Sequence, residues 1–334
     1  MTVEITTVAD DEAVIFRERT LRRYDELRPD TVHDLDGVEV RTLPRRGELL
    51  CRFATVNDVH FGETVAGSIG PEDLFPTFSV PDGSEPYPDF MNRGAIREIS
   101  EIEPAAVVVK GDLTSNGTEA EFHRFLDAYG PAFGDRLSYV RGNHDSYHGG
   151  TFAAFEHQRI DLPGVTIALL DTAREHQVGG SLSTDQLEWL DTLAAEADRP
   201  VLVLGHHNAW HPGTDPDTAD FFGIRPDDSR KLIDLVARRP RVVGYAAGHT
   251  HRNLRRTNPE TGDVPFVEVA CVKDFPGTWA EYRVFDGGIM QIHHRISTPE
   301  ALEWSEATRQ MFGGMYHLYA FGGLDDRCFL VETA

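Results

Sequence analysis

Five short segments of the sequence carry side chains that could bind metal ions. They are Asp58-Val-His60, Gly111-Asp112, Gly142-Asn-His-Asp145, Gly205-His206 and Gly248-His-Thr-His251. Each follows a run of apolar residues that predicts a strand ending at a turn. Together they offer carboxylates, an amide oxygen and imidazoles, with no thiolate. That mixture suits first-row divalent ions such as Mn, Fe, Zn or Co better than Ca or a structural Zn site.

The number of these side chains predicts two ions rather than one, because seven or more ligands exceed what one ion needs. Each segment also has an ordinary interpretation. Asp-x-His alone is more often a turn than a ligand pair, and His206-His207 could simply close a buried strand. His-x-His is stronger, since alternate residues of an extended chain face the same way. The ordered combination of all five favours a metal site.

The stretch Ala105–Thr114 shows how such a residue is positioned. Its apolar run, rich in valine and stopped by Gly111, predicts a buried parallel strand. Parallel strands deliver the next residue to the carboxyl edge of a sheet, where open α/β folds place their ligands. Asp112 is therefore expected at that edge, although a lone Gly-Asp could equally be a turn or a helix N-cap.

The ordered set resembles the calcineurin-like metallophosphoesterases over about residues 58–251. Within that superfamily, three segments resemble the class III cyclic-nucleotide phosphodiesterase branch: Gly111–Thr118, Leu169–Thr172 and Gly180–Ser183 with Gln186–Leu190. The resemblance implies an α/β fold, a four-layer αββα sandwich of two mixed β-sheets flanked by helices. The alternation of strands and helices, with strands clustered late, independently favours two packed sheets in a single domain.

The resemblance also implies roles for individual residues. One ion would be held by Asp58, His60, Asp112 and His251, and the other by Asp112, Asn143, His206 and His249, so that Asp112 is shared. The cofactor is then a pair of divalent or mixed-valence ions of Mn, Fe or Zn. His144 would be the general acid, and Asp145 its partner. The family usually continues the fourth segment as His-His-Pro, whereas this chain has Asn208 in the third position; we keep His206 as the ligand.

The expected function is hydrolysis of a small phosphodiester, with a 3′,5′-cyclic nucleotide as the first substrate to test. In this scheme a hydroxide bridging two ions attacks phosphorus while His144 protonates the leaving oxygen. A phosphomonoesterase with the same centre is the nearest alternative, because the metal ligands do not encode how many ester groups phosphorus carries. A non-catalytic metal-binding interaction module is a remote alternative.

The composition of the sequence restricts the kinds of binding partner that we expect. The 334 residues carry a net charge of −23, which repels long nucleic acid and disfavours a nuclease. No apolar run approaches the ~18 residues of a membrane span, and the acidic N-terminus lacks the pattern of a secretory signal. Three widely spaced cysteines argue against a disulfide framework. We therefore expect a cytoplasmic enzyme of a small phosphate ester, without membrane partners, and leave a homo-oligomer open.

The chain is expected to divide into a lead-in (1–47), a metallophosphoesterase domain (48–296) with an insertion loop (61–91), and a C-terminal helix and tail (297–334). The sequence also predicts three local elements: a helix over 11–27, a hairpin joining 38–43 to the strand 49–56, and a helix around 151–157. Ser183 and Gln186 predict a capping box. The insertion and the tail could wall the substrate pocket or form a subunit contact.

Overall fold

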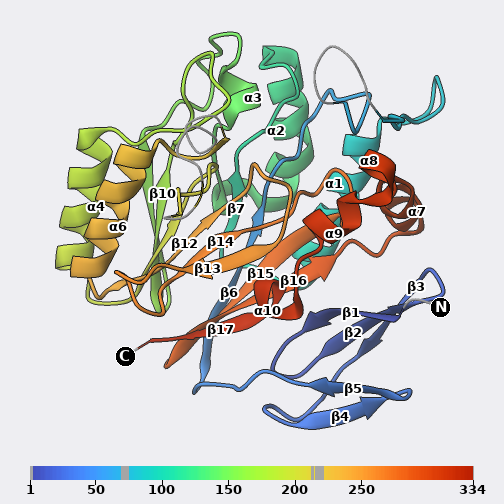
Figure 1. The fold of residues 1–334 in the computed structure, drawn as a ribbon, viewed down its shortest axis with the longest axis horizontal. Helices are drawn as coiled ribbons and strands as arrows, with labels where there is room; N and C mark the ends of the chain where they lie inside the picture. The colour runs from blue at the N-terminus through green and yellow to red at the C-terminus, as the bar shows by residue number, and fades with distance from the viewer. Residues whose placement is uncertain (1–2, 69–74, 212–213, 215–221, 334) are drawn as a thin grey trace.

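Two six-stranded sheets pack face to face, with helices on both outer sides (Figure 1). The computed structural model describes residues 3–68, 75–211, 214 and 222–333. The architecture confirms the predicted αββα sandwich. Part of the predicted insertion loop, residues 69–74, lies outside the described residues. In the part of the chain that the structure describes, no helix has the length and apolar character needed to span a bilayer.

The first sheet contains the valine-rich strand of the sequence. In spatial order its strands are β17 (Phe329–Glu332), β16 (Gly288–Arg295), β15 (Thr278–Phe285), β6 (Leu49–Val56), β7 (Val107–Lys110) and β8 (Leu137–Val140). Strands β6, β7 and β8 are parallel, whereas β15, β16 and β17 are antiparallel to their neighbours. The carboxyl ends of β6, β7 and β8 therefore lie at one edge.

The second sheet brings two more of these strand ends to the site. In spatial order its strands are β13 (Leu254–Thr257), β14 (Pro265–Glu268), β12 (Val242–Ala247), β11 (Val201–Leu204), β10 (Val165–Leu170) and β9 (His157–Leu162). The inner strands β10, β11, β12 and β14 are parallel, and the outer strands β9 and β13 are antiparallel to their neighbours. His206 and His249 follow β11 and β12.

Strand β7 is buried on both faces, which explains its three consecutive valines. Val107 and Val109 pack against helices α1 (Tyr87–Glu101), α2 (Glu119–Phe133) and α7 (Pro299–Thr308). Val108 points to the opposite face and packs between the sheets with Ile167 and Leu169. Burying each valine contributes about 1.5–3 kcal/mol. The other outer face is covered by α4 (Thr184–Glu196) and α6 (Pro226–Arg238), coloured yellow-green to orange in Figure 1.

Helix α4 begins where the sequence predicts. The hydroxyl of Ser183 accepts a hydrogen bond from the backbone N–H of Gln186 at 3.1 Å, and the Gln186 side chain accepts one from the Ser183 backbone at 2.9 Å. The predicted capping box is confirmed. It satisfies two backbone N–H groups that the helix start would otherwise leave without partners.

The predicted helix over 11–27 is wrong, because this segment is a β-hairpin. Strands β2 (Ala13–Arg17) and β3 (Thr20–Tyr24) pair through a loop in which Glu18 and Arg19 have φ of 55° and 62°. Positive φ at both loop residues matches the twist of a two-residue hairpin. With β1 (Val3–Val8) they form a sheet whose Ile15 packs against Met290 of β16. The packing of this hairpin against β16 favours strands over the predicted helix.

Two further local predictions are wrong. Strand β5 (Val38–Arg41) pairs with β4 (Val32–Leu35) and not with β6, whose edge is taken by β15. No helix forms around 151–157; this segment is a turn leading into β9. The smaller elements among the described residues are a 3₁₀ turn (Gly134–Arg136), α3 (Asn143–Ser146), α8 (Met311–Gly314), α9 (Tyr316–Ala320) and α10 (Leu324–Arg327).

The lead-in and the tail both pack onto the central domain. The hydroxyl of Thr7 in β1 donates to the carbonyl of His293 in β16 at 2.7 Å. The last strand, β17, pairs with β16 at the edge of the first sheet. The division at residues 48 and 297 stays a prediction.

Candidate metal centre

The first group of predicted ligands forms a compact cluster that joins the two sheets. Ligand atoms of Asp58, His60, Asp112 and His251 all lie within 4.8 Å of one another. Nε2 of His60 is 3.4 Å from Oδ2 of Asp112, and Nε2 of His251 is 3.4 Å from Oδ1 of Asp58. The turns after β6, β7 and β12 supply these residues. Donor atoms separated by such distances can surround one small cation.

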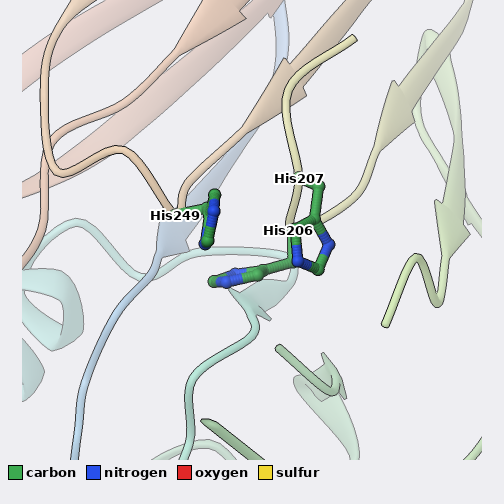
Figure 2. A group of neighbouring side chains, drawn as sticks. All are labelled: His206, His207 and His249. Atoms are coloured by element: carbon green, nitrogen blue, oxygen red, sulfur yellow. The ribbon is translucent and has the colours of Figure 1, made fainter. Parts of the chain in front are cut away.

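The second group meets the first at Asp112. Nε2 of His206 lies 3.4 Å from Oδ2 of Asp112 and 3.1 Å from Oδ1 of Asn143. The Asn143 amide N–H donates to the hydroxyl of Tyr147 at 2.6 Å, which directs the amide oxygen toward the cluster. The rings of His206 and His249 have centroids 5.1 Å apart and come from neighbouring strand ends, as Figure 2 shows.

His207 lies beside this group, but its ring nitrogens already have partners. One nitrogen, Nδ1, lies 2.8 Å from the hydroxyl of Thr172, and Nε2 lies 3.0 Å from the carbonyl of Val178. Thr172 belongs to the segment Leu169–Thr172 that carried the branch resemblance. These contacts favour His206 over His207 as the ligand at this strand end.

The backbone around the cluster is strained in a recurring way. Five of the seven candidate ligands have φ between 48° and 67°, in the left-handed region that residues with a Cβ rarely adopt. They are Asp58, His60, Asp112, His249 and His251. Gly142 is required by close approach, because a Cβ there would lie 2.2 Å from Oδ1 of Asp112. Such strain persists only where surrounding structure enforces it, and it is typical of functional sites.

The two buried carboxylates give the cluster negative charge that positive groups must balance. Burial opposes ionisation of Asp58 and Asp112, yet the facing histidines hold the pKa of both carboxyl groups below the usual range. Burial disfavours protonation of His206, but its hydrogen bond to Asp112 and that carboxylate's charge raise its pKa to about 9. Burial and the charge of His206 lower the pKa of His249 to about 3. With no ion bound, a proton on His206 supplies positive charge beside the two buried carboxylates, and a bound cation would take the place of that proton.

Unpartnered ring nitrogens show that metal ions fit these residues. Both ring nitrogens of His60 and both of His249 are buried without a hydrogen-bond partner among the described residues. A buried polar atom without a partner costs about 1–3 kcal/mol. Imidazole nitrogens, carboxylates and an amide oxygen are suitable donors for Mn, Fe or Zn. Coordination would satisfy these atoms and neutralise the carboxylates.

The expected pairing of His144 with Asp145 is not formed among the described residues. Nδ1 of His144 lies 2.7 Å from the carbonyl of Ser115 instead. The carboxylate of Asp145 accepts hydrogen bonds from the backbone N–H groups of Leu113, Thr114 and Gly142 and from the Thr114 hydroxyl, at 2.6–3.0 Å. Asp145 is fully buried and joins the turn after β7 to the turn after β8. Its contacts indicate a structural role.

Sequence reasoning missed three residues behind His60. Oε2 of Glu63 lies 3.7 Å from Nδ1 of His60, and Nζ of Lys273 lies 2.9 Å from the same oxygen. Nζ of Lys273 also donates to Asp274 at 3.0 Å. Groups behind a metal ligand orient it and tune its basicity. The sequence offered one signal for Glu63, which follows His60 by three positions. It offered none for Lys273, because this residue lies 210 positions after Glu63.

A family model described as calcineurin-like phosphoesterase matches residues 51–253. Its span includes all the predicted ligands.

Three curated relatives match part of the chain. A protein of Synechococcus sp. named "probable cyclic nucleotide phosphodiesterase" is 26% identical over 154 residues, 45% of this chain and 58% of that protein. A "probable glycerophosphodiester phosphodiesterase" of Arcobacter nitrofigilis is 27% identical over 162 residues, again 45% and 58%. A 3′,5′-cyclic adenosine monophosphate phosphodiesterase of Escherichia coli is 25% identical over 222 residues, 64% and 74%. The chain thus spans little more than half the length of the first two relatives.

A solved structure shares the fold. A dimetal phosphatase from Danio rerio aligns with a TM-score of 0.57 and 16% identity, covering 75% of this chain and 98% of that one. Three observations indicate the same family: the matched family model, the two stacked sheets and the order of the ligand-type residues at the strand ends. This chain belongs to the calcineurin-like phosphoesterase family.

Proposed function

We propose that this chain is a dinuclear metal-dependent phosphoesterase that hydrolyses a small phosphodiester, with a 3′,5′-cyclic nucleotide as the first substrate to test. The observation that carries the proposal is the convergence of Asp112 and six other ligand-type side chains at the strand ends, with buried ring nitrogens of His60 and His249 left without partners among the described residues. The three relatives above are all named phosphodiesterases, which supports a diester over a monoester.

The seven side chains divide into two sets that share one carboxylate. One set is Asp58, His60, Asp112 and His251; the other is Asp112, Asn143, His206 and His249. Ions of Mn, Fe or Zn bound there would supply Lewis acidity toward phosphoryl oxygens and acidify a water molecule. The amide of Asn143 adds no negative charge to the second set, which keeps its ion the stronger Lewis acid.

His144 is the candidate general acid. Because a carbonyl oxygen only accepts, the Ser115 carbonyl fixes a proton on Nδ1 and leaves Nε2 to exchange a proton with a substrate. The ring centroid lies 4.6 Å from that of His60, and His144 lines the pocket that opens over the cluster. The His144 backbone N–H donates to Oδ1 of Asp112 at 2.9 Å, which fixes the ring relative to the shared carboxylate. An alkoxide leaves poorly unless such a group protonates it.

A substrate panel tests the proposal. The purified protein is loaded with Mn, Fe or Zn and assayed with bis-p-nitrophenyl phosphate, p-nitrophenyl phosphate and 3′,5′-cyclic AMP, before and after chelation. Metal-dependent hydrolysis of the diesters is the expected result. Fast turnover of the monoester with inert diesters would favour the phosphomonoesterase alternative. No hydrolysis of any ester by protein with measured bound metal would contradict an enzyme and favour a non-catalytic metal-binding module.

A further inference from the structure

The C-terminal tail forms one wall of the pocket above the candidate metal centre. The pocket has a volume of about 820 Å³ and reaches His60, His144, His249 and His251, which is within the range of small-molecule sites. The tail residues that line it are Met311, Phe312, Met315, Tyr316 and Tyr319. Helices α8 and α9, in red in Figure 1, carry four of these residues, and Met315 lies in the turn between the helices. The tail lies outside the residues that the family model matches.

Hydrogen bonds tie the tail to the loop that carries His251. The Tyr319 hydroxyl donates to the carbonyl of Thr250 at 2.9 Å, and the backbone N–H of Asn253 donates to the carbonyl of Ala320 at 3.0 Å. The Tyr316 hydroxyl donates to Oδ1 of Asp274 at 2.8 Å. The wall therefore has a fixed position relative to the candidate ligands.

These contacts decide what the wall can offer a ligand. Both tyrosine hydroxyl groups already donate to protein acceptors, so neither is a free donor. Tyr316 is buried, and Tyr319 is the tyrosine that presents ring surface to the pocket. Met315 adds a thioether and is 59% exposed. Tyr319 is 46% exposed, and the Arg252 guanidinium, itself paired with Glu268, lies over its ring, 5.2 Å from the centroid. At the tail wall neither tyrosine hydroxyl is free to donate to a polyol, whereas a flat aromatic group would gain stacking on Tyr319 and apolar contact with Met315.

We propose that the tail wall is a binding subsite for an aromatic group attached to the substrate phosphate, as in a nucleotide, with Tyr319 as its principal residue. This inference rests on the proposed function, because it places the phosphate at the candidate metal centre. It selects between chemistries that the relatives leave open: an aromatic nucleoside group rather than glycerol. The fixed hydroxyl of Tyr319 orients its ring, which suits a planar ligand better than a flexible chain.

The same helix supplies a matched control. Leu318 neighbours Tyr319 and is 76% exposed, yet it does not line the pocket. If the exposed tail served only as a subunit contact, replacing Leu318 would affect ligand binding as much as replacing Tyr319.

Calorimetric titration of the Mn-loaded protein with adenosine 5′-monophosphate and with ribose 5-phosphate isolates the aromatic group. We expect tighter binding of the nucleotide by roughly 5- to 150-fold, the usual range for one stacked base. Tyr319→Phe keeps the ring and should keep most of this preference. Tyr319→Leu keeps apolar area without a ring and should lose it, whereas Leu318→Ala should match wild type. Thermal unfolding of each variant shows that the fold is retained.

The outcomes separate the subsite from the proposed function. Equal affinities for the two ligands in wild type, no measurable nucleotide binding, or an unchanged preference in Tyr319→Leu would overturn the subsite. If the nucleotide preference holds while the Mn-loaded protein hydrolyses none of the panel esters, the subsite stands and the proposed function fails. If the protein hydrolyses the diesters but binds the nucleotide no more tightly than ribose 5-phosphate, the proposed function stands and the subsite fails.

Discussion

Nδ1 of His206 lies 2.7 Å from the main-chain carbonyl oxygen of Lys110. His206 follows β11 of one sheet, and Lys110 is the last residue of β7 in the other. The contact therefore joins the two sheets at the candidate metal centre. Because the carbonyl oxygen accepts a hydrogen bond from the Nδ1–H group, Nε2 is the ring nitrogen that faces Asp112 and Asn143. The orientation of a candidate ligand is thus set by the backbone of the strand that positions Asp112.

Replacing the shared carboxylate should remove metal from both sets. For Asp112→Asn we expect the metal content per chain, measured by plasma mass spectrometry, to fall by more than half. We also expect a loss in kcat/KM for diesters. This loss should exceed the loss of about 10- to 100-fold that is typical when a residue hydrogen-bonded to a metal ligand is replaced. Asp127→Asn, an exposed change on α2, should leave both values unchanged. Full metal content in Asp112→Asn would contradict the shared-ligand assignment.

Removing the candidate general acid should affect poor leaving groups most. His144→Ala should lower kcat for 3′,5′-cyclic AMP by about 10²–10⁴-fold, because a ribose alkoxide must be protonated as it leaves. p-Nitrophenolate leaves without a proton, so the loss on bis-p-nitrophenyl phosphate should be much smaller. Steady-state kinetics on both substrates measure the difference. His123→Ala, at an exposed site on α2, is the control, and equal losses on the two substrates would argue against acid catalysis by His144.

Asp145 should matter for stability. Asp145→Ala leaves the buried N–H groups of Leu113, Thr114 and Gly142 without their acceptor. At about 1–3 kcal/mol for each buried group left unsatisfied, the free energy of unfolding should fall by more than about 2 kcal/mol. Urea denaturation measures this change, with Asp127→Ala as an exposed comparison. A change below about 0.5 kcal/mol, the usual scale of surface substitutions, would contradict the structural role.

Glu281 should make the fold sensitive to acid. Burial opposes its ionisation, but the hydrogen bond to His294 and the Arg283 guanidinium outweigh burial and lower its pKa to about 2. Nε2 of His294 and Nε of Arg283 each lie 2.8 Å from its carboxylate. A lowered folded-state pKa stabilises above the ordinary value of 4.5, and this contribution is lost as pH falls toward 2.

The contribution of Glu281 is on the order of 3 kcal/mol for this shift, and the part of it that is lost between pH 7 and pH 3 is measurable by denaturation. Glu281→Gln should be less stable than wild type at pH 7, and the gap should narrow as pH falls below about 4.5. The exposed change Glu188→Gln should follow the wild-type curve. A gap of constant size across this range would show that protonation of Glu281 is not responsible.

Local patterns were sufficient where one signal dominated. The apolar run of β7 predicted a strand buried on both faces, because alternate valines meet a helix layer and the opposite sheet. The Ser183–Gln186 box predicted the start of α4, since its hydrogen bonds join residues three apart. The hairpin of β2 and β3 was missed because its packing against Met290 involves residues more than 250 positions away.

The sequence by itself determined which residues could form a metal centre, in what order, and that strands would carry them to one edge. Only the tertiary structure decided their orientation: the Lys110 carbonyl sets the His206 ring, and Ser115 rather than Asp145 bonds to His144. It also placed Lys273 and Glu63 behind His60 and the tail over the pocket. Side-chain spacing within a segment follows from backbone geometry, whereas these contacts join distant segments, so only the packing of the two sheets and the tail specifies them.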